Sequence, residues 1–276
     1  SLISLLRYLI VRDNYRKFLP NNYRDIESEY GIVTDLFKKN NNLFIHTSEG
    51  LWELPKNLQE KVTDELVTYI GTGAFFSLPP RLLNDSQVGN IGSIHKWGTI
   101  KTPYGILIIS EIEGKIYLFE EGITPISNLG NRAFFENNLK GFFSNQFYDL
   151  TGVEFPNKNN PANNNGVGYI SAFDGKFERF LITKKDYLLL PEFEEDLEIS
   201  ETTPTAFGVI SVTPPSFPEI IFSLEDNKFY TYTVTQVTPT GWEITPVQLL
   251  FTDKEYFQDK SFTISFSTLD KTWTSW

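Results

Sequence analysis

Five short stretches of similar residue order constrain the fold of this chain more than any other feature. Each has an acidic residue beside a turn residue and a bulky apolar residue just after it, and the turn residues are Gly50, Gly114, Gly175, Asn227 and Lys271. In the clearest stretch, residues 166–185, alternating apolar residues flank Asp174-Gly175. A Gly at this place accepts the positive φ of a tight hairpin turn. We therefore predict five β-hairpins with the acidic turns at their tips.

The spacing of these turns indicates how the hairpins are organised. Successive turn residues lie roughly 45 to 65 residues apart, and the lower end of this range matches one four-stranded propeller blade. The prediction is an all-β fold of propeller-like, repeated antiparallel hairpins with a few short helices, covering residues 1–276 as one β domain. The alternative is an ordinary all-β protein whose hairpins share turn chemistry by chance.

Composition supports the β class and excludes some functions. The chain has 24 Phe, 13 Tyr and 5 Trp, and aromatic residues favour half-buried pleated surfaces. Its net charge of −11 argues against specific nucleic-acid binding, which needs a basic surface. The apolar residues 2–11 are too few to span a membrane, so we expect a buried strand or a short helix there.

The chain contains neither Cys nor Met, which excludes disulfides and zinc-thiolate sites. It begins within an apolar run and ends on another, residues 262–276. From these features we expect a fragment of a longer polypeptide, whose two ends are covered by flanking pieces of the same precursor or by a neighbouring subunit.

Local patterns predict four further elements. Residues 57–68 place Leu58, Val62 and Leu66 at helical spacing, which predicts a surface helix, and residues 126–143 predict a short helix. Residues 157–166, NKNNPANNNG, offer the backbone many turns and no apolar face, which predicts a mobile Asn-rich surface loop. The run GILIIS, residues 105–110, is typical of a strand buried on both faces.

Candidate chemical groups are few and scattered. His95 and His46 lie far from any second histidine or carboxylate cluster in the sequence, so a surface or packed histidine is favoured over a metal ligand or a catalytic base. The acidic run 192–201 lacks the fixed oxygen spacing and the Gly turn of a calcium loop, which favours a solvated face. No nucleophile elbow, phosphate loop, dinucleotide fingerprint or zinc-protease helix is present. The sequence predicts no catalytic, cofactor-binding or metal-ligating residue and no enzyme activity.

One turn is similar to the Asp-box of sialidase-like propellers, Ser-X-Asp-X-Gly-X-Thr-Trp. Residues 223–230 have the same order but replace Asp by Glu, Gly by Asn and Thr-Trp by Phe-Tyr, and the copy near the end keeps Thr272-Trp273 without a Gly. An Asp-box is an element of the turn and not a catalytic site, so it predicts no sialidase activity.

Several stretches, read together, resemble the tail stabilisation or "muzzle" proteins of short-tailed bacteriophages, especially the crAss-like phages. The similar stretches follow the order of the family along nearly the whole chain and are residues 21–54, 92–119, 126–139, 166–187 and 260–276. The resemblance implies a virion protein near the tail tip, built of propeller-like β modules and assembled as a symmetric oligomer. It implies no catalytic residues, and both ends of this chain fall inside the family pattern.

The functional hypothesis from this resemblance is a structural component of a phage tail that stabilises the tail and contributes to the path of genome ejection. The expected partners are identical subunits in a ring, flanking fragments of the same precursor and other tail proteins. One alternative is a propeller that binds or cleaves glycans, for which Trp52, Trp97 and Trp242 are candidate stacking platforms. The other is a scaffold propeller of cellular origin.

Overall fold

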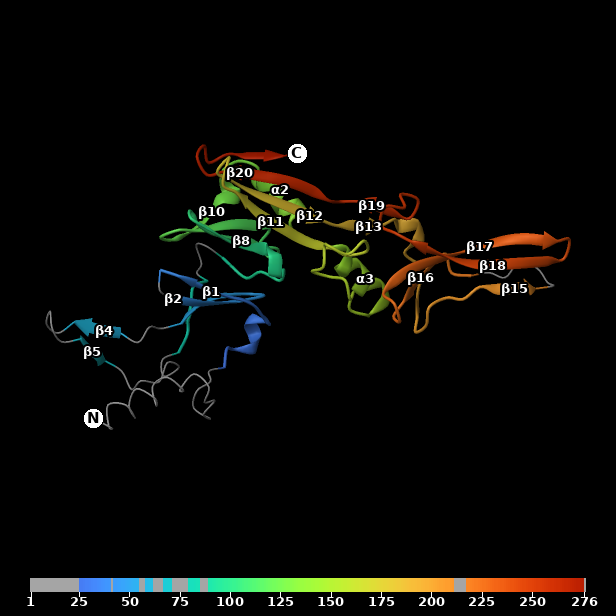
Figure 1. The fold of residues 1–276 in the computed structure, drawn as a ribbon, viewed down its shortest axis with the longest axis horizontal. Coiled ribbons are helices and arrows are strands. Elements are labelled where there is room, and N and C mark those ends of the chain that lie inside the picture. Colours follow the sequence, from blue (N-terminus) through green and yellow to red (C-terminus); the bar gives the residue numbers. More distant parts are fainter. Residues whose placement is uncertain are drawn as a thin grey trace, which may run out of the picture. The chain divides into compact units, whose positions relative to one another are not determined.

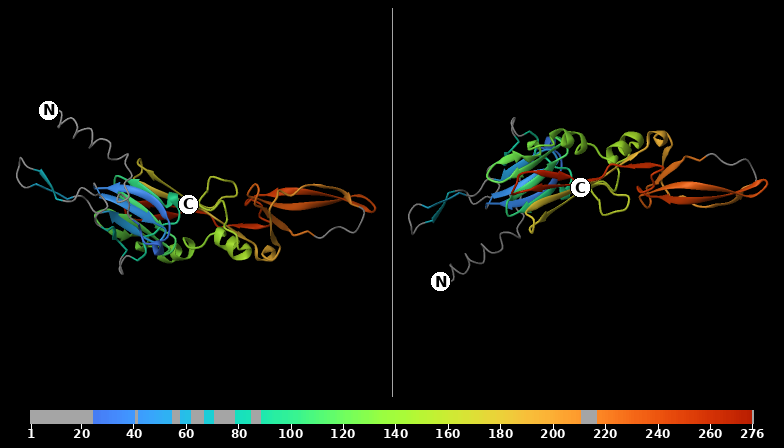
Figure 2. Two further views of the ribbon diagram at one scale, coloured as in Figure 1. Left: turned by 90° about the horizontal axis from the view of Figure 1, so that it is seen from below. Right: turned by 90° about the horizontal axis from the view of Figure 1, so that it is seen from above.

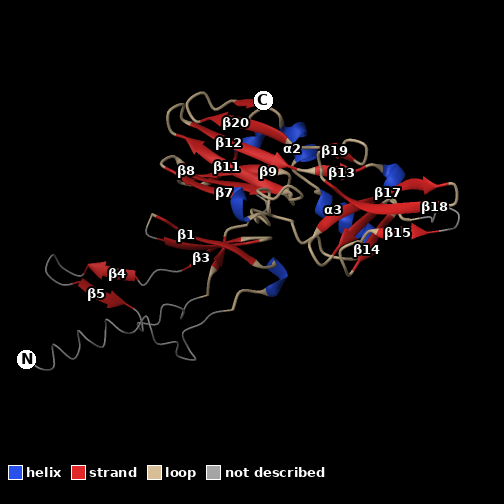
Figure 3. Cartoon of the chain, turned by 45° about the vertical axis from the view of Figure 1, so that its right-hand side comes forward, coloured by secondary structure: helices blue, strands red, loops and turns tan. Residues whose placement is uncertain are grey.

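The computed structural model describes residues 25–40, 42–54, 58–61, 67–70, 79–84, 89–210 and 217–275, and the apolar residues 2–11 lie outside them. Strands account for 46% and helices for 13% (Figure 3). The helical share is below the third that is usual in globular proteins. The prediction of a mainly β protein with few helices is confirmed.

The chain divides into two compact units, residues 1–92 and 93–276. The first unit contains an antiparallel sheet of order β1-β2-β3-β6 and a strand pair β4-β5. Its strands are β1 (Val33–Lys39), β2 (Asn42–Thr47), β3 (Leu51–Leu54), β4 (Leu58–Lys61), β5 (Val67–Ile70) and β6 (Arg81–Leu82), and η2 (Ser28–Tyr30) is a 3-10 turn. Phe37 and Phe44 face each other across β1 and β2, are buried, and stack with ring centroids 5.4 Å apart.

The second unit begins with two four-stranded antiparallel sheets, of order β10-β9-β8-β7 and β11-β12-β20-β21. The first consists of β7 (Thr99–Thr102), β8 (Gly105–Ser110), β9 (Lys115–Phe119) and β10 (Ile123–Pro125), and the second of β11 (Gly168–Asp174), β12 (Arg179–Lys185), β20 (Phe262–Ser267) and β21 (Trp273–Ser275). Ile106 to Ile109 are all buried, which confirms the buried strand predicted at residues 105–110. Within the described residues, the sheets do not close into a barrel or a propeller.

The second sheet is interrupted by an insertion between its strands β12 and β20. The insertion opens with β13 (Tyr187–Leu189), closes with its antiparallel partner β19 (Phe257–Asp259), and carries a five-stranded sheet between them. That sheet has the order β14-β16-β17-β18-β15 and consists of β14 (Leu197–Ser200), β15 (Phe207–Ile210), β16 (Ile220–Ser223), β17 (Lys228–Thr238) and β18 (Gly241–Leu249). Only β14 and β16 pair in parallel within it. Figure 1 shows β17 and β18 as a long hairpin that projects from the rest of this unit.

One hydrophobic core joins the two four-stranded sheets of the second unit to the base of the insertion. Its centre is aromatic: Phe229 lies within 6.2 Å, between ring centroids, of six other Phe rings, namely Phe143, Phe147, Phe155, Phe222, Phe251 and Phe257. Ile182, Ile264 and Phe266 extend the core into the second sheet. The insertion is therefore packed into the unit at its base.

All five predicted acidic turns lie at hairpin tips, between β2 and β3, β8 and β9, β11 and β12, β16 and β17, and β20 and β21. The expected positive φ at Gly175 is wrong, because the left-handed residue of that turn is Glu178, with φ 48°. The loop spans residues 175–178, and the Asp174 carboxylate accepts the N–H groups of Lys176 and Phe177 at 3.1 and 3.3 Å. An Asx-stabilised longer loop moves the left-handed position to its end. Gly114, Asn227 and Lys271 do have positive φ, as their role as turn residues requires.

The helix expected at residues 57–68 is wrong. The described part of this segment forms β4, which pairs with β5 from Leu58 opposite Ile70 to Lys61 opposite Val67. β-Branched Val67 and Thr68 favour the strand, and three apolar residues at helical spacing do not outweigh that preference. In residues 126–143 the structure has η4 (Ile126–Asn128) and α2 (Arg132–Asn138), which confirms a short helix, and then α3 (Phe143–Thr151), which the sequence analysis missed.

The Asn-rich segment 157–166 differs from the expected surface loop. Asn157 and Asn165 are buried, and the Asn165 amide donates to the Leu249 carbonyl oxygen at 3.2 Å and accepts the Phe251 N–H at 3.4 Å. The Lys185 ammonium group donates to the carbonyl oxygens of Pro161, Asn163 and Asn164. These contacts argue against a mobile loop. Asparagine amides form hydrogen bonds with buried backbone groups of the insertion, so the segment is held in place without an apolar face.

Candidate functional site

The neck of the insertion, formed by β13 and β19, continues the β12-β20 pair past a single bend at Asp186. The Asp186 N–H donates to Ser261 Oγ at 3.1 Å, and its carbonyl oxygen accepts the Lys260 N–H at 2.9 Å. Register is therefore preserved across the bend, from Lys184 opposite Phe262 to Tyr187 opposite Asp259. The insertion is thus attached by hydrogen-bonded strands on both sides and not by loose linkers.

A buried ion pair anchors this bend to the helices. Lys184 Nζ lies 2.9 Å from Asp186 Oδ2, and both side chains are buried, with exposed fractions of 4% and 6%. Lys184 also donates to the carbonyl oxygens of Asn138 and Gly141, and Asp186 Oδ1 accepts the N–H of Phe143, the first residue of α3. Burial raises the pKa of Asp186, and the Lys184 charge opposes that shift. The saturated hydrogen bonds make this pair a structural clamp and leave it no free group for chemistry.

The arm is the distal part of the insertion: β15, residues 231–238 of β17 and residues 241–247 of β18. Residues 233–238 of β17 are exposed without interruption. Glu243 is the only charged residue in positions 229–249, and positions 205–210 have none. Figure 2 shows in two views that this hairpin extends away from the remaining strands of its unit.

The two faces of the arm differ in chemistry. On one face Tyr232, Val234 and Gln236 of β17 lie opposite Pro246, Ile244 and Trp242 of β18. Phe217 and Phe207 cover part of this face, since Phe217 lies 4.7 Å from Tyr232 and 6.2 Å from Phe207 between ring centroids, and Ile244 is fully buried. The other face carries Thr231, Thr233 and Thr235. The arm therefore has an apolar face with a small core of its own and a threonine face in solvent.

One long edge of the arm has no strand beside it among the described residues. β16 pairs with β17 only through Ile221, Phe222 and Ser223, which face Tyr230, Phe229 and Lys228. Beyond Tyr230, the β17 residues pair with β18 on one side alone. An unpaired strand edge presents alternating N–H and C=O groups to any extended chain that approaches it. This edge is the most distinctive candidate interaction site in the described part of the protein.

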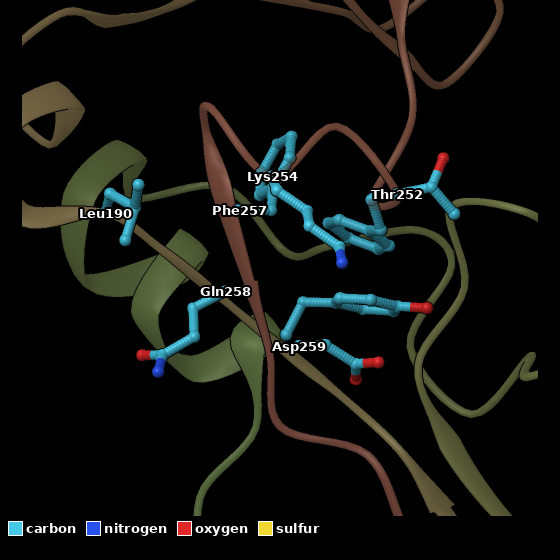
Figure 4. Close-up of a pocket in the computed structure, with 8 residues that line it drawn as sticks. Leu190, Thr252, Lys254, Phe257, Gln258 and Asp259 are labelled. Atoms are coloured by element: carbon cyan, nitrogen blue, oxygen red, sulfur yellow. The ribbon is translucent and has the colours of Figure 1, made fainter.

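A pocket of about 420 Å³ lies at the neck, lined by Tyr187, Leu190, Phe251, Thr252, Lys254, Phe257, Gln258 and Asp259 (Figure 4). Tyr187 and Phe251 stack with ring centroids 4.3 Å apart and an interplanar angle of 17°. Burial, and next the Asp259 carboxylate, raise the pKa of Tyr187. Figure 4 shows Gln258 on the opposite side of β19 from Lys254 and Asp259. The pocket thus combines an aromatic wall with polar groups of both charge signs.

The structure places the two histidines in different, buried environments. His46 Nε2 lies 2.8 Å from the Ile91 carbonyl oxygen, and burial lowers its pKa. His95 is 5% exposed, and burial lowers its pKa to about 4. Of the two positions that the sequence left open, surface or packed, both side chains take the packed one.

His95 has a buried carboxylate neighbour that the sequence analysis missed. Glu111 Oε1 lies 3.8 Å from His95 Nε2, and burial raises the pKa of Glu111 to about 7. Because His95 is neutral at pH 7, this approach is not an ion pair. The Glu111 carboxylate accepts the N–H groups of Ile94 and His95 at 3.0 and 3.2 Å, so it ties segment 93–98 to the turn between β8 and β9. The sequence contains no signal for this contact, because the two residues lie on different loops.

The three candidate tryptophans lie on different elements of the fold. Trp52 lies buried in β3, Trp97 is exposed in the 3-10 turn η3 (Lys96–Gly98), and Trp242 lies on β18 of the arm. The acidic run 192–201 forms the 3-10 turn η5 (Pro191–Phe193) and β14, with Glu192, Glu195 and Glu198 exposed. Across the described ranges, no group of three or more His, Asp or Glu side chains is arranged to hold a metal ion.

No protein-family model and no curated protein sequence matches this chain. Within the part that the structure describes, no helix is long and apolar enough to cross a membrane. The sequence contained one signal for the arm: between Phe229 and Leu249, β-branched and aromatic residues accumulate and charge is nearly absent. Such a stretch normally predicts a buried strand, and only the structure reveals that much of it is exposed.

Proposed function

We propose that this chain is a non-catalytic structural protein of a bacteriophage tail, positioned near the tail tip. The observation that carries the proposal is the arm, whose exposed strands carry one charged residue, Glu243, and form a surface that a neighbouring subunit of a larger assembly would cover. A large exposed apolar or strand-edge surface is a liability in an isolated protein and a normal feature of an assembly subunit. The resemblance of five collinear stretches to tail stabilisation proteins of short-tailed phages supports the same role.

The propeller architecture belongs to this proposal. The sheets β1-β2-β3-β6, β10-β9-β8-β7 and β11-β12-β20-β21 are each four-stranded and antiparallel, the composition of a propeller blade. We propose that they are blades of an incomplete propeller that identical subunits, flanking fragments of the same precursor or other tail proteins complete. An acidic wall, consistent with the charge of −11, would let DNA pass without binding tightly during ejection.

Purified phage particles test the proposed function. Mass spectrometry of particles from the host that produces this chain should detect its peptides at a fixed ratio to the major tail proteins, and gold-labelled antibodies should mark the tail tip. Absence of the chain from particles, with abundant chain in the lysate, would overturn the proposal. The same result would favour a scaffold propeller of cellular origin.

The neck pocket supports glycan binding as a second candidate function. Sugars bind to aromatic faces beside amide, carboxylate and ammonium groups, and Tyr187, Lys254 and Asp259 supply these types around one cavity. Titration of the full chain with a panel of bacterial surface oligosaccharides should then produce saturable binding that Lys254→Ala weakens. A Lys260→Ala variant, changed just outside the pocket, should bind like the unaltered chain. Equal binding by both variants, or none by the unaltered chain, would exclude this pocket as a glycan site.

A further inference from the structure

We propose that a pocket between α3 and residues 154–158 binds a neutral sugar residue of a glycan. This α3 pocket has a volume of about 360 Å³ and is lined by Ser144, Asn145, Tyr148, Asp149, Glu154, Phe155 and Lys158. Its volume lies within the usual range of small-molecule sites, about 300 to 1,000 Å³. The lining residues differ from those of the neck pocket, so the inference goes beyond both candidate functions described above.

Both walls of the α3 pocket are fixed by the core of the second unit. On one side, α3 begins at Phe143, whose ring packs on that of Phe155 with centroids 5.3 Å apart. Phe155 is 1% exposed and adds a rigid apolar surface to the lining. On the other side, Asn157 is buried and donates to the Asn227 carbonyl oxygen at 3.3 Å, which holds residues 154–158 in place. A site fixed in this way loses little conformational freedom when a ligand binds.

The polar side chains that α3 contributes to the pocket are available to a ligand. The helical repeat places Ser144 beside Tyr148 and Asn145 beside Asp149, so all four lie on one side of α3. Among the described residues, none of these four side chains has a hydrogen-bond or ion-pair partner. Together they present hydroxyl, amide, phenol and carboxylate groups on one surface.

The charges of the α3 pocket favour a neutral ligand. Asp149 and Glu154 are acidic and Lys158 is basic, so the lining keeps one negative charge, on a chain of net charge −11. This charge disfavours phosphate and acidic sugars. In the described part of the chain no group of three or more His, Asp or Glu side chains is arranged for a metal ion. A purely apolar ligand would leave the polar groups of the lining without partners, at a cost in free energy.

A sugar ring complements each of the remaining groups. Its C–H face packs on an aromatic ring, and Tyr148 is 51% exposed. The two oxygens of Asp149 can accept hydroxyl groups on neighbouring carbons, and the Asn145 amide both donates and accepts. The ion pair of Glu154 with Lys158 has exposed fractions of 69% and 48%, and exposed ion pairs are weak. Sugar hydroxyls can therefore replace the solvent around both of these charges.

Calorimetric titration of the full chain with neutral oligosaccharides tests the inference, with oligomers of glucose, galactose, mannose and N-acetylglucosamine as the probes. We expect saturable binding of at least one of them. Asp149→Asn should weaken that binding about tenfold, because it removes a charge-assisted hydrogen bond. Tyr148→Ala should weaken the binding by a similar factor, because it removes the stacking surface.

Each of these variants has a matched control that should bind like the unaltered chain. Glu195→Gln removes the same charge at an exposed residue outside the pocket. Leu150→Ala shortens a side chain of α3 that is 36% exposed and does not line the pocket. All four variants should keep the circular dichroism spectrum and the melting midpoint of the unaltered chain, so that lost binding is not a lost fold.

Three results would overturn the inference. They are the absence of binding to every neutral oligosaccharide, an equal loss of affinity in Asp149→Asn and Glu195→Gln, and tighter binding of an oligogalacturonate than of any neutral probe. Loss of binding in Lys254→Ala with full binding in Asp149→Asn would also overturn it, since the glycan would then occupy the neck pocket. Presence of the chain in phage particles is measured separately, so the tail role and the sugar site can fail independently.

Discussion

At the residue scale, the structure uses buried polar groups to join segments that are distant in sequence. Glu111 holds the loop at Ile94 and His95, and Lys184 with Asp186 holds the start of α3. Their environments differ in one respect: the Lys184-Asp186 pair is fully hydrogen-bonded, whereas His95 Nδ1 has no partner in the described structure. Buried groups whose pKa differs between the folded and unfolded states make stability depend on pH.

Glu111 and His95 should make opposite contributions to that dependence. The pKa of Glu111 is raised from 4.5 to about 7, so the folded state keeps a proton that the unfolded state releases, and its contribution to stability is lost as pH rises from 4.5 to 7. The pKa of His95 is lowered from 6.5 to about 4, so its contribution is lost as pH falls from 6.5 to 4. Each pKa shift corresponds to a change of at most about 3 kcal/mol in the free energy of unfolding. The two slopes largely cancel in the unaltered chain.

Single variants should separate the two slopes in urea unfolding between pH 4.5 and 7.5. Glu111→Gln should become less stable toward acid, and His95→Gln less stable toward neutral pH. Lys184 and Lys158 also face His95, so the measurements belong at constant ionic strength. The control is Glu113→Gln, which changes a partly exposed residue of the same turn and should leave the nearly flat profile unchanged. Parallel profiles for the two variants would contradict the assignment.

At the scale of the element, four of the five hairpin turns have a left-handed residue late in the loop, namely Gly114, Glu178, Asn227 and Lys271, and the turn at Gly50 does not. Gly114 holds this position with φ 64°, and a Cβ there would come within 3.0 Å of the Glu136 Cα. Gly175 does not have a positive φ, and a Cβ there would meet no atom closer than 3.8 Å. Gly114→Ala should therefore cost about 1–2 kcal/mol of unfolding free energy, whereas Gly175→Ala should be neutral or stabilising by up to about 1 kcal/mol. Chemical denaturation of the two variants measures the difference in unfolding free energy. A larger loss for Gly175→Ala than for Gly114→Ala would instead support a tight Asp-Gly turn with a positive φ at Gly175.

The Asn-rich segment offers a second prediction at this scale. Asn165→Ala should destabilise the protein by about 1–3 kcal/mol, because it leaves the Leu249 carbonyl oxygen and the Phe251 N–H without their partner in a buried place. Asn164→Ala is the matched control, since Asn164 is an exposed neighbour in the same run of asparagines. Thermal melts of the two variants measure the difference. Equal melting midpoints would mean that the segment is the mobile loop that its composition predicts.

At the scale of the whole molecule, the continuous core predicts that the second unit unfolds as one body. Phe229 lies in the insertion, and Trp273 lies in the four-stranded sheet, where it packs on Phe135 and Phe266. Phe229→Ala should lower the free energy of unfolding by about 3–5 kcal/mol. The midpoints of the unfolding transitions followed by tryptophan fluorescence and by circular dichroism should fall together. Val209→Ala, at a residue that is 62% exposed on the arm, should change stability by less than about 0.5 kcal/mol. Separate transitions for sheet and insertion would contradict a shared core.

What the sequence by itself determined is local. Alternation and turn chemistry identified the five hairpins, the mainly β class and the buried strand at residues 105–110, because each depends on neighbours within a few residues. The left-handed position at Glu178 was missed because contacts of the Asp174 side chain outweighed the short turn pattern. The strand β4 was missed because its pairing with β5 outweighed three apolar residues at helical spacing. The tertiary structure alone decided that residues 186–261 interrupt a sheet, that Glu111 meets His95, and that β17 beyond Tyr230 has a strand partner on one side only among the described residues. A strand has the same alternation whether one or both of its edges are paired, so only the placement of distant segments reveals which strands lie beside it.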